Sequence, residues 1–145
     1  MPEINLNYLS ANQTRSIVDI ISAAMNPDEG KWADETIARH VALQESGISD
    51  GRFYFGIYHQ EDLCGIIGLH HYEWGPPQNV WLGWFAVAPE LQRRGIGSEA
   101  LRLVEGKARG LGFSKLFIET YSSPDFESAR QFYTKAGFVS VGTVA

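Results

Sequence analysis

Cysteine, positive charge and long apolar runs are all scarce in this sequence. Cys64 is the single cysteine of the 145-residue chain, so no disulfide can form within it, and the disulfide-rich folds of small secreted proteins are excluded. No apolar run approaches the roughly 20 residues that span a bilayer, and the first residues lack the basic and apolar regions of a secretory signal. We therefore expect a cytoplasmic protein with no membrane partner.

Acidic residues outnumber basic ones, 17 to 12, which gives a net charge of −5. Nucleic acid is excluded as the main partner because duplex binding needs a basic face, and a cationic substrate is mildly favoured. The histidines, at positions 40, 59, 70 and 71, show no ligand spacing with acidic partners, so no metal is implied. His70 and His71 would point to opposite faces of a strand. Cys64 lies in an apolar run, which favours a small buried side chain over a nucleophile.

A composition of 44% hydrophobic and 20% charged residues is that of a globular protein, and the length predicts one domain over residues 1–145. Apolar periodicity and turn residues predict the elements of the first part. In chain order they are a strand over residues 4–9, a helix whose capping box is Ser10 to Gln13, a break at 26–30, a helix capped by Asp34, and three antiparallel strands over 52–58, 63–72 and 81–87.

The second part alternates helices and strands. A helix begins at Gly97 and stops at Gly110 and Gly112, and residues 115–120 then form a strand parallel to 81–87, because an ordinary crossover connects parallel neighbours. Ser123 and Pro124 begin another helix, and a last strand starts at residues 138–142. The chain is therefore predicted to be α/β (α+β), with a mixed central sheet, an antiparallel N-terminal meander, a parallel central strand pair and flanking helices.

The segment at residues 92–98 lies between a buried strand and an amphipathic helix, where a backbone can bind phosphate. The first turn of a helix has unpaired N–H groups and a partial positive charge, and Gly95 and Gly97 have no Cβ to keep a phosphate away. Arg93 and Arg94 add two permanent positive charges. A basic turn whose glycines merely reverse the chain explains the segment alone equally well, so its surroundings must decide.

Two separate motifs in the sequence resemble motifs of one protein family. Residues 85–98 resemble the acetyl-CoA segment of the GNAT superfamily of N-acetyltransferases, and residues 129–138 resemble the last helix of that family and the start of its following strand. The resemblance implies the GNAT fold and acetyl-CoA as co-substrate. The residues that it implies for acetyl-CoA binding are Phe85, Ala86, Val87, Gln92, Arg93, Arg94, Gly95, Ile96, Gly97 and Ser98.

Two departures from the family pattern concern the cofactor arm and the end of the sheet. Phe126 stands where many members have an asparagine that contacts pantetheine, and Ser122, Ser123 or a backbone group is the suggested substitute. The family also has a second strand in its C-terminal hairpin, most of which this sequence lacks. Either the sequence stops before that strand or a partner supplies it, a homodimer being one such arrangement, because an uncovered strand edge is a liability.

The resemblance implies that Tyr133 protonates the CoA thiolate and that acetyl passes directly to a primary amine in a ternary complex. For the base that deprotonates the amine we expect Glu119, near the end of the parallel strand, with Glu73, His71 or a water chain as alternatives. The acceptor is expected near residues 25–35, which include Trp32 as a cation-binding face or a simple packing residue. A catalytically silent acyl-CoA-binding module is the rival function, and a dinucleotide-binding domain fits less well.

Overall fold

A five-stranded sheet lies at the centre of the structure, a computed structural model that describes residues 3–143. The strands lie in chain order across the sheet, and only the pair β4 and β5 is parallel. The elements are β1 (Asn5–Tyr8), η1 (Ala11–Gln13), α1 (Thr14–Ala24), α2 (Pro27–Glu45), β2 (Arg52–His59), β3 (Asp62–His70), β4 (Asn79–Val87), η2 (Pro89–Leu91), α3 (Ile96–Gly110), β5 (Lys115–Phe117), η3 (Pro124–Phe126) and α4 (Glu127–Lys135). The predicted mixed sheet, meander and parallel pair are confirmed.

The first two helices begin differently from each other. The capping box predicted at Ser10 to Gln13 is present and leads through a short 3-10 turn into α1. The cap predicted at Asp34 is wrong, because α2 begins at Pro27 and Asn26 is its N-cap. The Asn26 side chain accepts a hydrogen bond from the Glu29 N–H at 2.8 Å. Asn26 and Pro27, which we expected to break the chain, therefore begin a helix, because proline suits the first helical position.

The end of the chain departs most from the prediction. β5 stops at Phe117 instead of residue 120, because its pairing with β4 covers only Asn79 to Trp81. The last strand predicted from residue 138 is also wrong: residues 138–143 have no strand conformation. Val139 and Val141 are more than 80% exposed. A segment with strand-like composition needs a neighbouring strand to complete its hydrogen bonds, and none pairs with it in the described residues.

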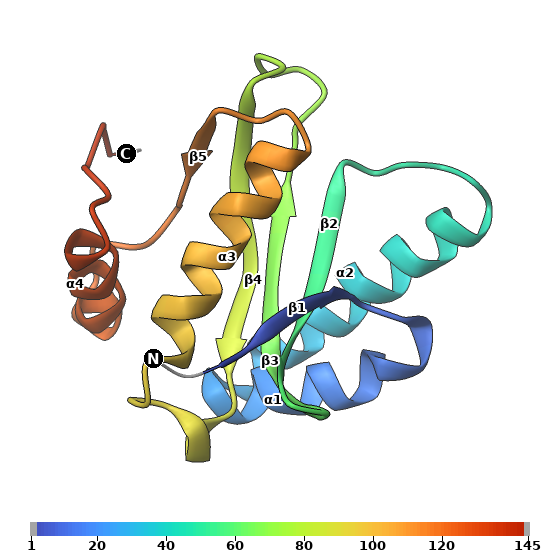
Figure 1. Ribbon diagram of the computed structural model, residues 1–145, viewed down its shortest axis with the longest axis horizontal. Helices are drawn as coiled ribbons and strands as arrows, with labels where there is room; N and C mark the ends of the chain where they lie inside the picture. Colours follow the sequence, from blue (N-terminus) through green and yellow to red (C-terminus); the bar gives the residue numbers. More distant parts are fainter. Residues whose placement is uncertain (1–2, 144–145) are drawn as a thin grey trace.

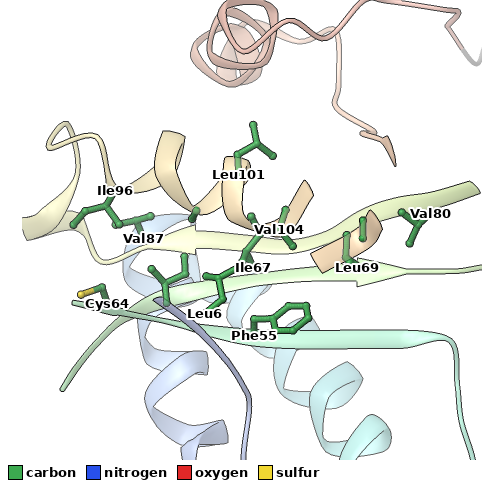
Figure 2. Packing of buried hydrophobic residues seen from close by; sticks show 13 residues of the cluster. Leu6, Phe55, Cys64, Ile67, Leu69, Val80, Val87, Ile96, Leu101 and Val104 are labelled. Carbon is green, nitrogen blue, oxygen red and sulfur yellow. The ribbon is translucent and has the colours of Figure 1, made fainter. Parts of the chain in front are cut away.

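Helices cover both faces of the sheet and form two apolar cores. Helix α3 packs on one face, where Val104 lies against Ile67 and Leu101 belongs to the same apolar cluster (Figure 2). Helices α1 and α2 cover the other face, where Ile17 and other apolar side chains of the two helices surround Tyr54 and Ile66 of the sheet. Helix α4 and the residues after it lie beyond β5, at the edge of the sheet (Figure 1).

Candidate functional site

The last residues of β4 leave backbone groups without a strand partner. Antiparallel pairing alternates, and the Ala88 N–H donates to the Cys64 carbonyl at 2.8 Å, so the amide of Ala86 faces β3 as well. The same alternation directs the N–H groups of Phe85 and Val87 away from β3. β5 ends beside Trp81 and does not reach them. Two backbone donors therefore face the opening between β4 and the chain that follows β5.

A bulge sets the direction of this part of β4. Leu82 pairs with Leu69 and Phe85 pairs with Ile67, so Gly83 and Trp84 together stand opposite the single residue Gly68. This two-to-one register is a β-bulge in β4. A Cβ at position 83 would lie 3.4 Å from the Gly68 backbone, an ordinary van der Waals contact, so the space at the bulge would admit a small side chain. The extra residue bends β4 just where β5 ends.

The glycine-rich loop has the geometry of an anion cradle. Gly95 is the N-cap of α3 and has a φ of 80°. It has no side chain that could accept hydrogen bonds from the free N–H groups of the first helical turn. Arg93 also has positive φ, at 65°. Arg93 and Arg94 are exposed and form no salt bridge within residues 3–143. Unpaired donors and free positive charge thus meet at one place.

Gln92 connects the loop to the end of β4. Its side-chain Nε2 donates to the Val87 carbonyl at 3.0 Å, which fixes the loop against the strand and occupies that carbonyl. The one acidic residue in the first turn of α3 is Glu99, and Arg102 pairs with it. The hydrogen bond from Arg102 holds the pKa of Glu99 below its usual value. The carboxylate charge at this helix terminus is therefore already compensated.

Helix α4 closes the same region from the side of β5. The Phe132 ring lies 6.1 Å from the ring of Phe85, and a Cβ at Gly97 would lie 3.7 Å from both rings. Residues from β4, α3 and α4 thus meet at one point. Tyr133 is half-buried between Phe132 and Phe138, and burial raises the pKa of its hydroxyl to about 12. The phenol remains protonated at neutral pH.

The loop between β5 and α4 is fixed by an arginine that sequence reasoning missed. The Arg130 guanidinium donates to the carbonyls of Tyr121 and Ser123, the latter at 2.9 Å. Phe126 packs edge-on against Tyr121, with ring centroids 4.9 Å apart. The side chain that replaces the family's asparagine therefore has a packing role in this loop. Only the fold brings Arg130 to these carbonyls, nine and seven residues earlier in the chain.

The three candidate bases lie at different places along β4. Glu119 is exposed two residues after Phe117, the partner of Trp81, and so lies on the side toward Phe85. Glu73 and His71 follow β3 at the opposite end of β4. The His71 Nδ1 donates to the Asn79 carbonyl at 2.9 Å, since a carbonyl only accepts. Of the three candidates, Glu119 alone follows the end of β5 that runs toward Phe85.

His70 and His71 point to opposite faces, as predicted. The His70 ring lies 4.1 Å from Tyr72, whereas His71 lies 5.3 Å from Phe113 in the α3 core. Cys64 is buried as expected, and burial raises the pKa of its thiol. No group of three histidine, cysteine, aspartate or glutamate side chains in residues 3–143 could hold a metal ion. Within the same range, no helix combines the length and apolar character needed to cross a membrane.

The region expected to hold the acceptor lies on α2. Trp32 is 57% exposed, so it does not pack a loop onto the core. Ala33 points into the α1 and α2 core, and Asp34 lies 3.9 Å from Arg15 of α1. Sequence reasoning missed a second aromatic group, formed where β3, β4 and β5 lie side by side: His70, Tyr72, Trp74, Trp81 and Phe117.

Comparison with known proteins places this arrangement among acetyltransferases. The sequence model of the acetyltransferase (GNAT) family matches residues 16–138. A GNAT-family protein from Desulfovibrio desulfuricans is 22% identical, with a TM-score of 0.82 over 97% of this chain and 86% of its own. The PaiA N-acetyltransferase of Thermoplasma acidophilum, solved with coenzyme A, is 16% identical, with a TM-score of 0.78 over 99% and 94%.

An aminoglycoside N-acetyltransferase, AAC(6')-Iy solved with CoA, is 13% identical, with a TM-score of 0.74 over 99% of this chain and 92% of its own. At these identities the structural likeness concerns the fold. None of the curated proteins matches the chain.

Proposed function

The chain belongs to the acetyltransferase (GNAT) family, and we propose that it transfers an acetyl group from acetyl-CoA to a primary amine by direct transfer in a ternary complex. The observation that carries this proposal is the meeting of two sets of free backbone donors. The N–H groups of Phe85 and Val87 face an opening in the sheet, and the first turn of α3 begins at Gly95 beside them. Gln92 joins the two sets by its hydrogen bond to Val87.

Each set of donors suits one part of the co-substrate. The first turn of α3, with Arg93 and Arg94, would bind the pyrophosphate through N–H groups and positive charge. The amides of Phe85 and Val87 would bind the pantetheine arm and the thioester carbonyl, where negative charge develops during attack. The neighbours solved with CoA support acetyl-CoA as the co-substrate of this chain.

Starting from an ammonium substrate, the nitrogen loses two protons, one before attack and one as the amide forms, and the thiolate gains one. The amine nitrogen attacks the thioester carbonyl carbon, the C–N bond forms, and the C–S bond breaks with release of the CoA thiolate. Glu119 would accept a proton from the substrate ammonium, directly or through water, because it follows β5 on the side toward Phe85. Tyr133 would protonate the departing thiolate, the conjugate base of a thiol of pKa about 8.5, and solvent would then reprotonate the phenolate.

A thiol-release assay with mass analysis of the amine tests the proposed function. The full chain is incubated with acetyl-CoA and separate polyamines, amino acids, aminoglycosides, arylalkylamines and peptide amines. We expect CoA release that depends on one class of amine, with an acetyl group added to that amine. Saturable acetyl-CoA binding without acetylation of any amine would contradict the enzyme and favour the second candidate below.

The second candidate is a catalytically silent acyl-CoA-binding module. It is favoured by the burial of Tyr133 among Phe132 and Phe138, and by Phe126 in place of an asparagine that contacts pantetheine. Such a module would use the same backbone donors and would leave the thioester intact. Hydrolysis-corrected thiol release therefore separates the two candidates.

A further inference from the structure

Two buried side-chain oxygens in residues 3–143 have no hydrogen-bond partner, Asn79 Oδ1 and Thr120 Oγ1. Buried polar groups are nearly always hydrogen-bonded, because an unpaired one costs free energy. Asn79 lies inside the sheet, where it pairs with Lys115 of β5. Thr120 lies three residues beyond the end of β5, outside the strand pairing. A partner for the Thr120 hydroxyl must therefore come from outside the sheet.

The segment after β5 runs toward the open end of β4. Phe117 pairs with Trp81, and the two parallel strands advance in the same direction. Three residues of extended chain cover roughly 10 Å, which is the advance from Trp81 to Trp84. Figure 1 shows the chain continuing in this direction beyond β5 before it turns outward to α4. Thr120 therefore lies on the Phe85 side of the end of β5.

Arg130 ties the residues that follow Thr120 to helix α4. Its guanidinium donates to the carbonyls of Tyr121 and Ser123, the latter at 2.9 Å, and it forms no salt bridge within the described residues. Helix α4 also packs an aromatic ring against the Phe85 ring, with centroids 6.1 Å apart. The loop after Thr120 and the end of β4 therefore share α4 as a neighbour. Thr120 thus borders the opening that the Phe85 amide faces.

The other side chains of this loop already have partners or solvent. Ser122 and Ser123, which we suggested from the sequence as contacts of the pantetheine arm, are exposed, so water can hydrogen-bond their hydroxyls. Phe126 packs on Tyr121, with ring centroids 4.9 Å apart. A ligand that binds the Thr120 hydroxyl displaces no hydrogen bond within the described residues, so the new bond is gained in full.

The hydroxyl can turn toward the opening without a movement of the backbone. Thr120 is half-buried as a residue, although its Oγ1 is buried. Rotation about the Cα–Cβ bond moves the hydroxyl between staggered positions, one of which the methyl group occupies before the rotation. This rotation breaks no hydrogen bond of the side chain within residues 3–143.

A threonine hydroxyl matches an uncharged partner that both donates and accepts. It supplies one donor and two acceptor lone pairs, and it carries no charge near neutral pH. Phosphate suits the first turn of α3 better, and an ammonium group suits the carboxylate of Glu119 better. A secondary amide offers one N–H and one carbonyl, which match the donor and acceptors of the hydroxyl. The pantetheine arm of an acyl-CoA contains such amides between its pyrophosphate and its thioester.

We propose that the Thr120 hydroxyl hydrogen-bonds an amide of the acyl-CoA arm, and that Arg130 is a positioning residue that holds the loop after Thr120 on α4. The proposal rests on acyl-CoA as the ligand of the proposed function. It concerns binding alone, so it applies to an acetyltransferase and to a silent acyl-CoA-binding module. The hydroxyl adds a side-chain contact to an arm that the backbone of Phe85 and Val87 would otherwise bind.

Calorimetric titration of the full chain with CoA, and with adenosine 3′,5′-bisphosphate, which lacks the arm, tests this proposal. Thr120→Val keeps the shape of the side chain and removes the hydroxyl, so the Kd of CoA should rise roughly five- to tenfold. The Kd of adenosine 3′,5′-bisphosphate should stay unchanged. Thr120→Ser keeps the hydroxyl and should bind CoA nearly as the wild type does. Thr36→Val on α2, which removes a hydroxyl that donates to the Trp32 carbonyl, is the matched control and should change neither Kd.

The unfolding temperature without ligand separates a binding role of Thr120 from a structural one. Because valine replaces a hydroxyl that has no partner, Thr120→Val should unfold at the wild-type temperature or above it. The increase that CoA causes in the unfolding temperature should be smaller in this variant. A lower unfolding temperature without ligand, with both ligands weakened by the same factor, would show a structural role and overturn the proposal.

A double-mutant cycle tests the role of Arg130. Arg130→Met removes the hydrogen bonds to the two loop carbonyls, so the Kd of CoA should rise roughly threefold. Thr120→Val should then raise the Kd by a smaller factor than it does in the wild-type background, because the loop no longer holds the hydroxyl at the opening. Strictly additive effects would overturn the positioning role.

The thiol-release assay keeps a failure of this contact distinct from a failure of the proposed function. Acetylation of an amine by the wild type, with an unchanged Kd of CoA in Thr120→Val, would overturn the contact and leave the enzyme intact. A raised Kd in that variant, with no amine acetylated by the wild type, would support the contact and overturn the enzyme. Absence of CoA binding by the wild-type chain would overturn both.

Discussion

The two ends of β4 are built in different ways. At the end near α3, the groups available for binding are backbone N–H donors of Phe85 and Val87, together with the first turn of α3 after Gly95. At the other end, Trp81 joins the aromatic group contributed by three strands and the loop after β3. Backbone donors suit a constant ligand such as acetyl-CoA. Side chains can vary between relatives of one fold, so the aromatic end is not constrained in this way.

Among the predictions for the donor side, removal of the Tyr133 hydroxyl should have the largest effect on kcat. Tyr133→Phe should lower kcat by roughly 100-fold, the usual contribution of a general acid, while the Kd of acetyl-CoA stays within about twofold. Because burial raises the pKa of Tyr133 to about 12, the wild-type rate should not fall from phenol ionisation below pH 10. Steady-state kinetics and calorimetric titration measure the two constants. Tyr121→Phe is the matched control, and an unchanged kcat in Tyr133→Phe would remove this residue from the mechanism.

Substitution of Glu119 tests which end of β4 supplies the general base. Glu119→Gln should reduce kcat/KM at pH 7 by about 100-fold and much less at high pH, where the amine is already neutral. A pH–rate profile from pH 6 to 10 measures the change. The same profile change in Glu73→Gln or His71→Gln, with Glu119→Gln unaffected, would move the base to the other end of the strand.

A substitution at Gly95 tests whether the first turn of α3 binds the phosphate groups of CoA. Valine is disfavoured at φ of 80° by about 1–2 kcal/mol, and its side chain would cover the first N–H groups of α3, so Gly95→Val should weaken CoA binding by roughly tenfold or more. Gly47 has a similar φ of 74° in the loop after α2, with nothing within 4 Å of an added Cβ. Gly47→Val should therefore cost similar stability and leave the Kd of CoA unchanged. Equal Kd values in both variants would argue against the cradle.

Substitution of Asp50 should have the smallest effect, and that effect is on the free energy of unfolding. Burial raises its pKa, but hydrogen bonds from the His40 ring at 2.9 Å and the Arg52 N–H at 3.1 Å outweigh burial and lower it. A lowered folded-state pKa contributes stability well above pH 4, which is lost as the pH falls through the folded-state pKa.

We therefore expect Asp50→Asn to lower the free energy of unfolding by about 1 kcal/mol at pH 7. Urea unfolding from pH 7 to pH 3 should show the difference from wild type shrinking as the pH falls. A difference that is constant with pH would mean that the carboxylate charge has no role. CoA affinity should stay unchanged, because Asp50 lies at the Trp81 end of the sheet, away from the first turn of α3.

The strand, loop and helix of the proposed donor site could be predicted from the sequence because their signals are local. Gly95, Gly97 and the neighbouring arginines lie within seven residues, and the geometry of a strand, loop and helix follows from their order. The meander and the parallel pair followed from periodicity and crossover rules for the same reason. Asn26 and Pro27 were misread as a break because the same dipeptide also starts a helix.

The aromatic contacts at the other end of β4 could not be predicted in this way. Trp81, Phe117 and His70 are far apart in the sequence and meet only through strand register, which includes a bulge at Gly83. The predicted last strand failed for a related reason, since residues 138–142 have alternating valines but pair with no strand in the described part of the chain. Pairing between strands depends on which neighbour is available, and local composition does not specify it.

A titration of the isotopically labelled full chain with CoA, followed by amide NMR, tests the central claim most directly. We predict saturable shifts of the Phe85 and Val87 amides and of residues 95–98, with little change at Trp74 near the other end of β4. Shifts concentrated at Trp74 and Tyr72, or no saturable shift at Phe85, Val87 and the first turn of α3, would contradict the assignment of the donor site.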